Sequence, residues 1–223
     1  MSFHQRLIAA TAGERERFLA IPILQHAVRH GVSRALYLDF LAEAYHHVRH
    51  TCPLLGLALA HSDDARYRRA LLDYLAEERG HDEWILQDIA ALGGDARAVR
   101  AGRPGRACEL MIGYAHYAIV WHGPWALLGM VHVLEGMSVV LATQAAGAIA
   151  ARLGGGDAAG FSYLRSHGSL DVEHTAFFRE LVDGIEQPAA QALIIDTARL
   201  MYGLYGDIFR ELAARHGDLR DAA

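Results

Sequence analysis

The stretch HGSLDVEHTAFFRELVDGI, residues 167–185, carries a helical pattern of apolar and ligand-type residues. At 100° per residue, a helix over this stretch brings His167, Asp171 and His174 within about 60° of one another. Val182 and other apolar residues share that face, whereas most of the charged residues lie outside it. The stretch therefore predicts an amphipathic helix whose buried side holds two imidazoles and one carboxylate.

The rest of the chain has the composition of an all-α protein. Apolar residues make up 52% of the 223 residues, alanine and leucine dominate, and clusters of β-branched residues, which favour strands, are rare. No linker divides the chain, so we expect a single domain over residues 1–223, an all-α bundle of about seven helices. Pro53 predicts a kink or a break near Cys52 in the second helix. The expected helices run over Glu14–His30, Ser33–Ala60, Ser62–Leu92, Arg106–Trp121, Pro124–Leu153, Phe161–Ile185 and Pro188–His216.

Charge and cysteine content exclude several kinds of protein. The formal net charge is −5 with mixed signs along the chain, so no basic stripe is available to bind nucleic acid. Cys52 and Cys108 lie far apart and form no CxxC pair, which is typical of a reducing compartment. Residues 1–12 lack the pattern of a secretory signal. We therefore expect a cytoplasmic protein that binds neither nucleic acid nor membranes.

One apolar segment is long enough to cross a membrane. From Trp125 to Ala151 its only ionised side chain is that of Glu135, but small and polar residues interrupt it, so we expect a central buried helix. A buried carboxylate needs a partner, which is either a metal ion or an arginine of another helix, unless it is protonated. His132, one turn earlier, either supports a metal ligand through a hydrogen bond or is a core histidine.

Two copies of a carboxylate-x-x-His pattern favour a metal site. Asp171-x-x-His174 is one copy, and Glu78-x-x-His81 in the third expected helix is the other. At this spacing, carboxylate and imidazole reach the same point from successive turns of a helix. Glu78 lies at the centre of an apolar stripe and Glu77 nearly a quarter turn away, which favours Glu78. The alternative for the Asp171 copy is a His–Asp hydrogen-bond cluster in the core or a cleft.

Glu43, in the second expected helix, is a further candidate carboxylate. Its own face and another apolar face through Leu41 are both suited to point inward, so the pattern leaves the orientation of Glu43 open. Three histidines follow it closely. His46, His47 and His50 form either a second metal site or a histidine-rich surface at the mouth of a cavity.

Taken together, these residues match the arrangement by which helical bundles hold two iron or manganese ions. That arrangement takes one carboxylate from each of two helices and a carboxylate-x-x-His pair from each of two others. Mixed imidazole and carboxylate ligands suit iron or manganese, and no cysteine lies on these faces. In chain order, the candidate metal ligands are Glu43, Glu78, His81, Glu135, His167, Asp171 and His174.

The sequence resembles the heme-oxygenase-like diiron oxidases and oxygenases, which share their fold with the TenA thiaminases and pyrroloquinoline quinone synthase. The resemblance covers nearly the whole chain and rests on Glu78, His81, Glu135 and His167-x-x-x-Asp171-x-x-His174. The chain differs from the commoner pattern at Tyr74, where the family usually has a glutamate about two helical turns before the first histidine.

The resemblance implies two metal-binding groups with bridging carboxylates between them. His81, Glu135 and His167 would form one group, and Glu78, Asp171 and His174 the other. Glu43 would match a further carboxylate found in some members. Two ferrous ions would then activate dioxygen, and the enzyme would oxidise a small organic substrate by carbon–carbon cleavage, desaturation or nitrogen oxygenation.

We accordingly expect an oxidoreductase that binds dioxygen and a small-molecule substrate, with an electron donor as a further partner and a homodimer as its assembly. One alternative is a metal-free TenA-like thiaminase or hydrolase with Cys108 as the nucleophile. Another is a non-enzymatic helical protein that carries a metal or a ligand, which consumption of dioxygen would distinguish from an oxidase. A heme oxygenase would leave the carboxylates of Glu135 and Asp171 unexplained.

Overall fold

The chain folds into helices, as its composition predicts, in this computed structural model. The structure describes residues 1–153 and 160–217, and the side chains of Thr143 and of residues 166–174 lie outside the described part. The helices are α1 (Phe3–Ala10), α2 (Ala12–Leu19), α3 (Pro22–His30), α4 (Arg34–Val48), α5 (Thr51–His61), α6 (Ala65–Glu78), α7 (His81–Ala91), α8 (Ala96–Ala101), α9 (Arg106–Trp121), α10 (Ala126–Arg152), α11 (Ser162–Asp183) and α12 (Pro188–His216).

The described residues form twelve helices, so the expected number of about seven was too low. One reason is that the helix expected over Ser33–Ala60 is two helices, α4 and α5, separated at Arg49 and His50. Pro53 lies in the first turn of α5, where its missing N–H leaves no hydrogen bond unmade. Of the two predicted outcomes near Cys52, the structure has the break, which the proline follows, and not a kink in a continuous helix.

The helix expected over Ser62–Leu92 is also divided, and this division falls inside the predicted ligand pattern. Gly80 adopts the left-handed conformation, with φ of 95°, which residues with a side chain rarely adopt. Glu78 is the last residue of α6 and His81 is the first residue of α7. The Glu78-x-x-His81 pattern therefore spans a turn between two helices, and it does not lie on successive turns of one helix.

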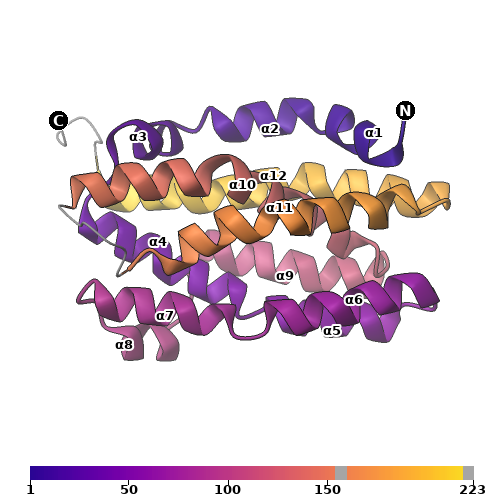
Figure 1. Cartoon of the computed structure of the whole chain (residues 1–223), viewed down its shortest axis with the longest axis horizontal. Coiled ribbons are helices and arrows are strands. Elements are labelled where there is room, and N and C mark those ends of the chain that lie inside the picture. The colour runs from indigo at the N-terminus through magenta and orange to yellow at the C-terminus, as the bar shows by residue number, and fades with distance from the viewer. Residues whose placement is uncertain (154–159, 218–223) are drawn as a thin grey trace.

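The long helix α10 lies at the centre of the bundle. It packs against α11, α12, α3 and α9, and Figure 1 shows α10, α11 and α12 running along the longest axis of the molecule. The helices α1 to α3 lie on one side of these three, and α4 to α9 lie on the other (Figure 1). Buried apolar residues of α10, such as Leu128, Val133 and Met137, join a continuous core. A central buried helix was expected here.

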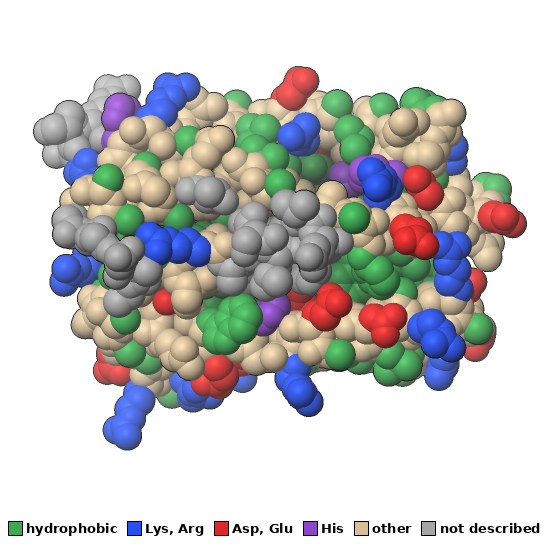
Figure 2. Space-filling model, viewed as in Figure 1, with side chains coloured by type: hydrophobic (Ala, Val, Ile, Leu, Met, Phe, Trp, Pro, Cys, Tyr) green, Lys and Arg blue, Asp and Glu red, His purple; other side chains and the backbone are tan. Residues whose placement is uncertain are grey.

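Within the described residues, no single helix passes a length and composition test for crossing a membrane. One pair of helical segments, Ala126–Ala142 with Gln144–Arg152, passes it jointly and is bent by 47°. On the face of the molecule shown in Figure 2, side chains of both charges are interspersed, as the mixed charge pattern of the sequence predicts.

The N-terminus of α11 is held by a carboxylate from another helix. Asp88 of α7 is buried, and its Oδ1 accepts hydrogen bonds from the backbone N–H of Ser162 at 3.1 Å and from the hydroxyl of that residue at 2.8 Å. Its Oδ2 accepts a hydrogen bond from the backbone N–H of Tyr163 at 2.8 Å. The first N–H groups of a helix have no partner within the helix, and a negative charge is favoured beside them. Asp88 therefore fixes where α11 begins.

We predict that Asp88→Ala lowers the free energy of unfolding by about 2–3 kcal/mol, because the buried N–H of Tyr163 and the partly buried N–H of Ser162 lose their acceptor. Urea unfolding measures the change. Asp73→Ala on α6 removes an exposed carboxylate and serves as the control, with an expected effect within about 0.5 kcal/mol. Equal effects of the two substitutions would contradict the role assigned to Asp88.

Candidate metal centre and adjoining cavity

A cavity of about 180 Å³ lies inside the bundle and follows α10. The helices α3, α4, α5, α6, α10, α11 and α12 contribute to its wall, which consists mainly of aliphatic and aromatic side chains. Its polar lining consists of four tyrosines together with His47, Thr51, Glu78, Glu135 and Ser138. An apolar cavity with a few polar groups converging on it has the character of a small-molecule site.

Two of the candidate carboxylates, Glu78 on α6 and Glu135 on α10, line this cavity. Burial raises the pKa of the Tyr74 hydroxyl well above its usual value, and the negative charges of Glu135, Glu78 and Glu77 raise it further, in that order. The carboxylates of two helices thus act on one buried hydroxyl group. Glu77 is exposed and does not line the cavity. Glu78 does line it, as its position at the centre of the apolar stripe predicted.

His81 lies beside Glu78 across the Gly80 turn. Its Nδ1 is 3.1 Å from Oε2 of Glu78, and both side chains are largely shielded from solvent, with exposed fractions of 5% and 12%. The imidazole also stacks on the ring of Trp84, with the ring centroids 4.4 Å apart. A buried carboxylate and imidazole therefore meet here although they belong to separate helices.

The remaining candidates His167, Asp171 and His174 belong to α11, and their side chains lie outside the described residues. The helix itself was predicted over Phe161–Ile185 and is confirmed with bounds Ser162–Asp183. It packs against α10, which carries Glu135, and against α7, which carries His81. Among the side chains that the structure describes, no group of three His, Cys, Asp or Glu residues is arranged to hold a metal ion.

Glu43 is placed apart from the other candidates. Its carboxylate is buried, forms an ion pair with Arg215 of α12 at 2.6 Å, and accepts hydrogen bonds from the backbone N–H of Gly105 at 3.0 and 3.1 Å. Gly105 is the N-cap of α9, so a helix N-terminus adds a favourable positive potential. Glu43 does not line the cavity, and its observed contacts join α4, α9 and α12.

The three histidines that follow Glu43 separate in the structure. His47 lines the cavity, and its Nδ1 lies 3.0 Å from the backbone oxygen of Glu43. His50 instead contacts His116 of α9, with Nδ1 and Nε2 3.4 Å apart. His46 is buried, and desolvation lowers its pKa. The described histidines of this group therefore do not converge on one point.

Residues 38–206 match the sequence model of a family described as iron-containing redox enzymes. The chain belongs to that family. The match includes the helices that carry Glu78, His81 and Glu135, and it also spans all of α11. The heme-oxygenase-like resemblance inferred from the residue pattern is thereby confirmed.

Solved structures with this fold include a domain of unknown function from Shewanella denitrificans, with 20% identity, a TM-score of 0.86 and coverage of 95% of this chain and 92% of that one. A TenA homologue from Pseudomonas syringae has 13% identity and a TM-score of 0.77, covering 94% and 92%. A heme oxygenase from Synechocystis in complex with heme has 12% identity and a TM-score of 0.75, covering 96% and 94%. No curated protein matches the sequence. At these identities the structural likeness establishes the fold alone.

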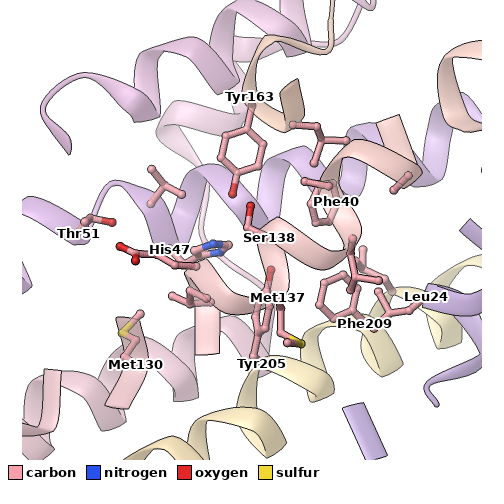
Figure 3. A pocket seen from close by; sticks show the side chains of 18 of the residues that line it. Leu24, Phe40, His47, Thr51, Met130, Met137, Ser138, Tyr163, Tyr205 and Phe209 are labelled. Carbon is pink, nitrogen blue, oxygen red and sulfur yellow. The ribbon is translucent and has the colours of Figure 1, made fainter. Parts of the chain in front are cut away.

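Three polar residues that line the cavity, Ser138, Tyr163 and Tyr205 (Figure 3), were not predicted from the sequence. His47 also lines it, and was predicted as one of three histidines that form either a second metal site or a surface at the mouth of a cavity. Each of the three hydroxyl-bearing residues stands among apolar residues at helical spacing, and a hydroxyl group there gives no motif. The only sequence signal for a cavity position was that of Ser138, which follows Glu135 closely on the same helix.

A second pocket of about 170 Å³ adjoins α10, and Glu135 belongs to the lining of both pockets. The second pocket is lined as well by His132, whose Nε2 is 3.3 Å from the hydroxyl of Thr11. Burial lowers the pKa of His132 to about 4. The imidazole is therefore neutral at physiological pH and serves as a hydrogen-bonding group of the core.

We predict that Glu43→Gln lowers the free energy of unfolding by about 1–3 kcal/mol, because Arg215 loses a buried charged partner but is itself partly exposed. Iron stoichiometry should stay that of the wild type. Thermal or urea unfolding and metal analysis measure the two quantities. Glu14→Gln breaks the exposed Arg17 pair and is the matched control, with at most about 1 kcal/mol lost. A folded Glu43→Gln protein with reduced iron content would show instead that Glu43 is a ligand.

A pH dependence follows from His132. Its pKa in the folded chain, about 4, lies below the usual value for a histidine, 6.5, so the unfolded chain binds the extra proton between these values. The stabilisation is present above pH 6.5 and is lost as the pH falls towards 4, with about 2 kcal/mol lost between pH 7 and pH 5. His132→Gln should flatten this dependence in urea unfolding, whereas the exposed His61→Gln should retain it. Parallel pH curves for wild type and His132→Gln would refute the assignment.

Proposed function

We propose that this chain is a non-heme diiron oxidase or oxygenase that uses dioxygen to oxidise a small organic substrate held in the α10 cavity. Two observations support the proposal: Glu78 and Glu135, from two helices, line one apolar cavity, and His81 of a third helix lies 3.1 Å from the carboxylate of Glu78. Carboxylates and imidazoles are costly to bury, and a metal cation stabilises them in such a place.

The donor set fits iron. Oxygen and nitrogen ligands from carboxylate and imidazole suit iron or manganese, and the described lining of the cavity contains no cysteine that would favour softer metals. Two carboxylates that line one cavity repel each other, and bound divalent cations would offset that repulsion. In this proposal His81, Glu135 and His167 would hold one ion, and Glu78, Asp171 and His174 would hold the other. Manganese has the same ligand preferences and is the alternative metal.

The iron pair, when bound, supplies the activation of dioxygen. The chain's own residues would bind and orient the substrate and exclude water from it. The apolar wall contributed by residues such as Leu54, Leu127 and Met130 lies in the same cavity as Glu78 and Glu135, so a substrate bound there lies close to the carboxylates. An external electron donor would return the irons to the ferrous state.

The metal-free hydrolase is the second candidate, because TenA homologues share the fold. Its proposed nucleophile, Cys108, is buried, and its Sγ donates to the backbone oxygen of Glu43 at 3.6 Å. Burial raises the pKa of this thiol, and the charge of Glu43 raises it further. A nucleophilic cysteine needs the opposite, a lowered pKa and an accessible sulfur, so the thiol environment favours the metal proposal.

Anaerobic addition of ferrous iron tests the proposal. The wild type should bind about two irons per chain, as dinuclear bundle sites do, and then consume dioxygen with a transient absorbance. Glu135→Ala and His174→Ala should each lose at least one iron and the absorbance, while circular dichroism shows an intact fold. His61→Ala, at an exposed position of α5, is the control that should behave as the wild type.

The outcomes separate the candidate functions. Iron binding without consumption of dioxygen would indicate a carrier. Failure to bind iron above background, or binding that the two ligand variants leave unchanged, would overturn the proposed metal centre. Hydrolysis by a metal-free protein that depends on Cys108 would instead establish the TenA-like alternative.

A further inference from the structure

The helix α9 exposes large apolar side chains on the side that points away from the bundle. Its buried side packs against α12, α5, α10 and α4, and Figure 1 shows the helix between α12 and α5. Nine large apolar side chains are exposed in the described part of the chain, and four of them lie on this one helix. They are Leu110, Tyr117, Val120 and Trp121, with exposed fractions of 54%, 50%, 42% and 73%.

These side chains form one stripe along the helix. At 100° per residue, Leu110, Tyr117 and Trp121 lie within about 40° of one another around the helix axis. The charged residues of the exposed side, Arg106 and Glu109, lie together in the first turn, before the stripe begins. A contiguous exposed apolar patch with a polar margin is typical of an interaction surface. We call Leu110, Gly113, Tyr117, Val120 and Trp121 the α9 face.

The area of the α9 face is suited to the centre of a protein interface. A buried aromatic side chain hides roughly 150–250 Å². With 50% of Tyr117 and 73% of Trp121 exposed, these two side chains present roughly 200–300 Å² to solvent. If two copies of the chain met on this face, the aromatic side chains would account for roughly 400–600 Å² of a typical total of about 1,600 Å². Tyrosine and tryptophan are also the residues that most often anchor such interfaces.

Gly113 forms a notch in the middle of the α9 face. It is exposed, and a Cβ atom built there would meet no atom within 4 Å, so packing inside the chain does not require a glycine. Glycine within a helix is less stable than alanine, because it loses more conformational freedom on folding. A glycine does, however, let a large side chain of another molecule come close to the helix backbone. The notch between Leu110 and Tyr117 is therefore suited to receive a large side chain from outside the chain.

The α9 face is complementary to a second copy of itself when the two helices run antiparallel. A two-fold axis at the level of Ala115 places Gly113 of one copy opposite Tyr117 of the other, so the large ring meets the notch. The same axis brings Leu110 opposite Trp121. A parallel pair would instead place Gly113 opposite Gly113 and leave the notch empty. The ring of Tyr117 is also held in place, because it contacts Trp121 and His122 of its own chain with ring centroids 6.5 and 5.2 Å apart.

The charges at the start of α9 also favour the antiparallel pair. In a parallel pair, Arg106 would face Arg106 and Glu109 would face Glu109, and like charges repel. In the antiparallel pair the two Arg106 positions lie about 27 Å apart along the helices, at 1.5 Å per residue. Each Arg106 then lies beside the C-terminal turn of the α9 helix of the other copy. The carbonyl groups at the C-terminus of a helix carry partial negative charge, which favours a cation there.

A lipid surface fits the α9 face less well than a second copy does. Helices that lie on membranes usually have a polar side rich in lysine and arginine. The polar margin of the α9 face has one arginine, Arg106, and one glutamate, Glu109, so their charges cancel. The notch at Gly113 also adds nothing to contact with a fluid lipid layer, whereas a matching protein surface fills it.

We propose that the α9 face is the centre of a symmetric homodimer interface, in which two α9 helices pack antiparallel and Tyr117 of each copy fills the notch at Gly113 of the other. Leu110 and Trp121 of opposite copies pack on either side of this central contact. The described lining of the α10 cavity contains no residue of α9, so the interface lies apart from the candidate metal centre. The dimer therefore forms whether or not iron is bound.

Sedimentation velocity and light scattering of the full chain test the proposal. The wild type should have twice the 24.4 kDa mass of one chain. Leu110→Glu should raise the dissociation constant of the dimer at least about 100-fold, because it buries an unpaired charge at two places in the interface. Leu72→Glu on α6 is the matched control, since Leu72 has the same exposed fraction of 54%, and it should remain a dimer. A monomeric wild type, or a dimer that Leu110→Glu leaves intact, would overturn the proposal.

An exchange of large and small residues tests the antiparallel contact itself. Gly113→Leu fills the notch and should weaken the dimer at least about tenfold, although leucine is the better helix former and circular dichroism should show an intact fold. Adding Tyr117→Ala to this variant creates a new notch opposite the new leucine, so the double variant should regain at least about tenfold in affinity. General damage to the chain would not be reversed in this way. A folded double variant that dimerises no better than Gly113→Leu would refute the antiparallel contact.

Flotation with vesicles of phosphatidylcholine and phosphatidylglycerol distinguishes the dimer from a membrane-binding helix. The wild type should not float with the vesicles, because the dimer covers the α9 face. Vesicle binding by a monomeric wild type that Leu110→Glu abolishes and Leu72→Glu retains would assign the face to a membrane and overturn the proposed dimer.

The dimer and the proposed oxidase are tested separately. Leu110→Glu should bind as much iron per chain as the wild type, because Leu110 lies outside the described cavity lining. Loss of the dimer with unchanged iron content is the result expected if both proposals hold.

Discussion

The need to stabilise carboxylates inside an apolar bundle governs this structure. Glu135 is the only ionised side chain in the central apolar segment of α10, and Glu78 lines the same cavity from α6. Burying such groups requires polar or charged partners at fixed positions. The surrounding helices supply these partners, and they can do so because each helix begins and ends at a defined residue. Gly80 brings His81 to Glu78, and Asp88 fixes the start of α11 beside α10.

How far the sequence determined these features differs from residue to residue. The helix α11 was predicted correctly because a long periodic stretch leaves few alternatives. The boundary between α6 and α7 was missed because one glycine inside a helical pattern is usually tolerated, and only its backbone conformation reveals a turn. Glu43 was ambiguous since two faces of its helix are apolar, and its partner Arg215 lies on a helix far away in the sequence. Periodicity identifies a face but not what covers it.

Family membership and fold leave the chemistry of the cavity to be argued from its own residues. Similar folds occur in a heme oxygenase and in TenA homologues, so the bundle does not by itself select a reaction. The selection comes from a few side chains on a shared scaffold. The proposed metal chemistry rests on the two carboxylates at the cavity wall, whereas the raised pKa of the buried Cys108 thiol is the opposite of what a cysteine nucleophile needs.

The turn at Gly80 also limits which residues can occupy that position. A Cβ atom built there would meet no atom within 4 Å, so space is not the constraint. The constraint is the positive φ of 95°, which asparagine tolerates better than most residues and β-branched residues hardly tolerate. Relatives that keep the same pairing across the turn should therefore have glycine or asparagine at this site, whereas those with valine or isoleucine should have a different connection between the two helices.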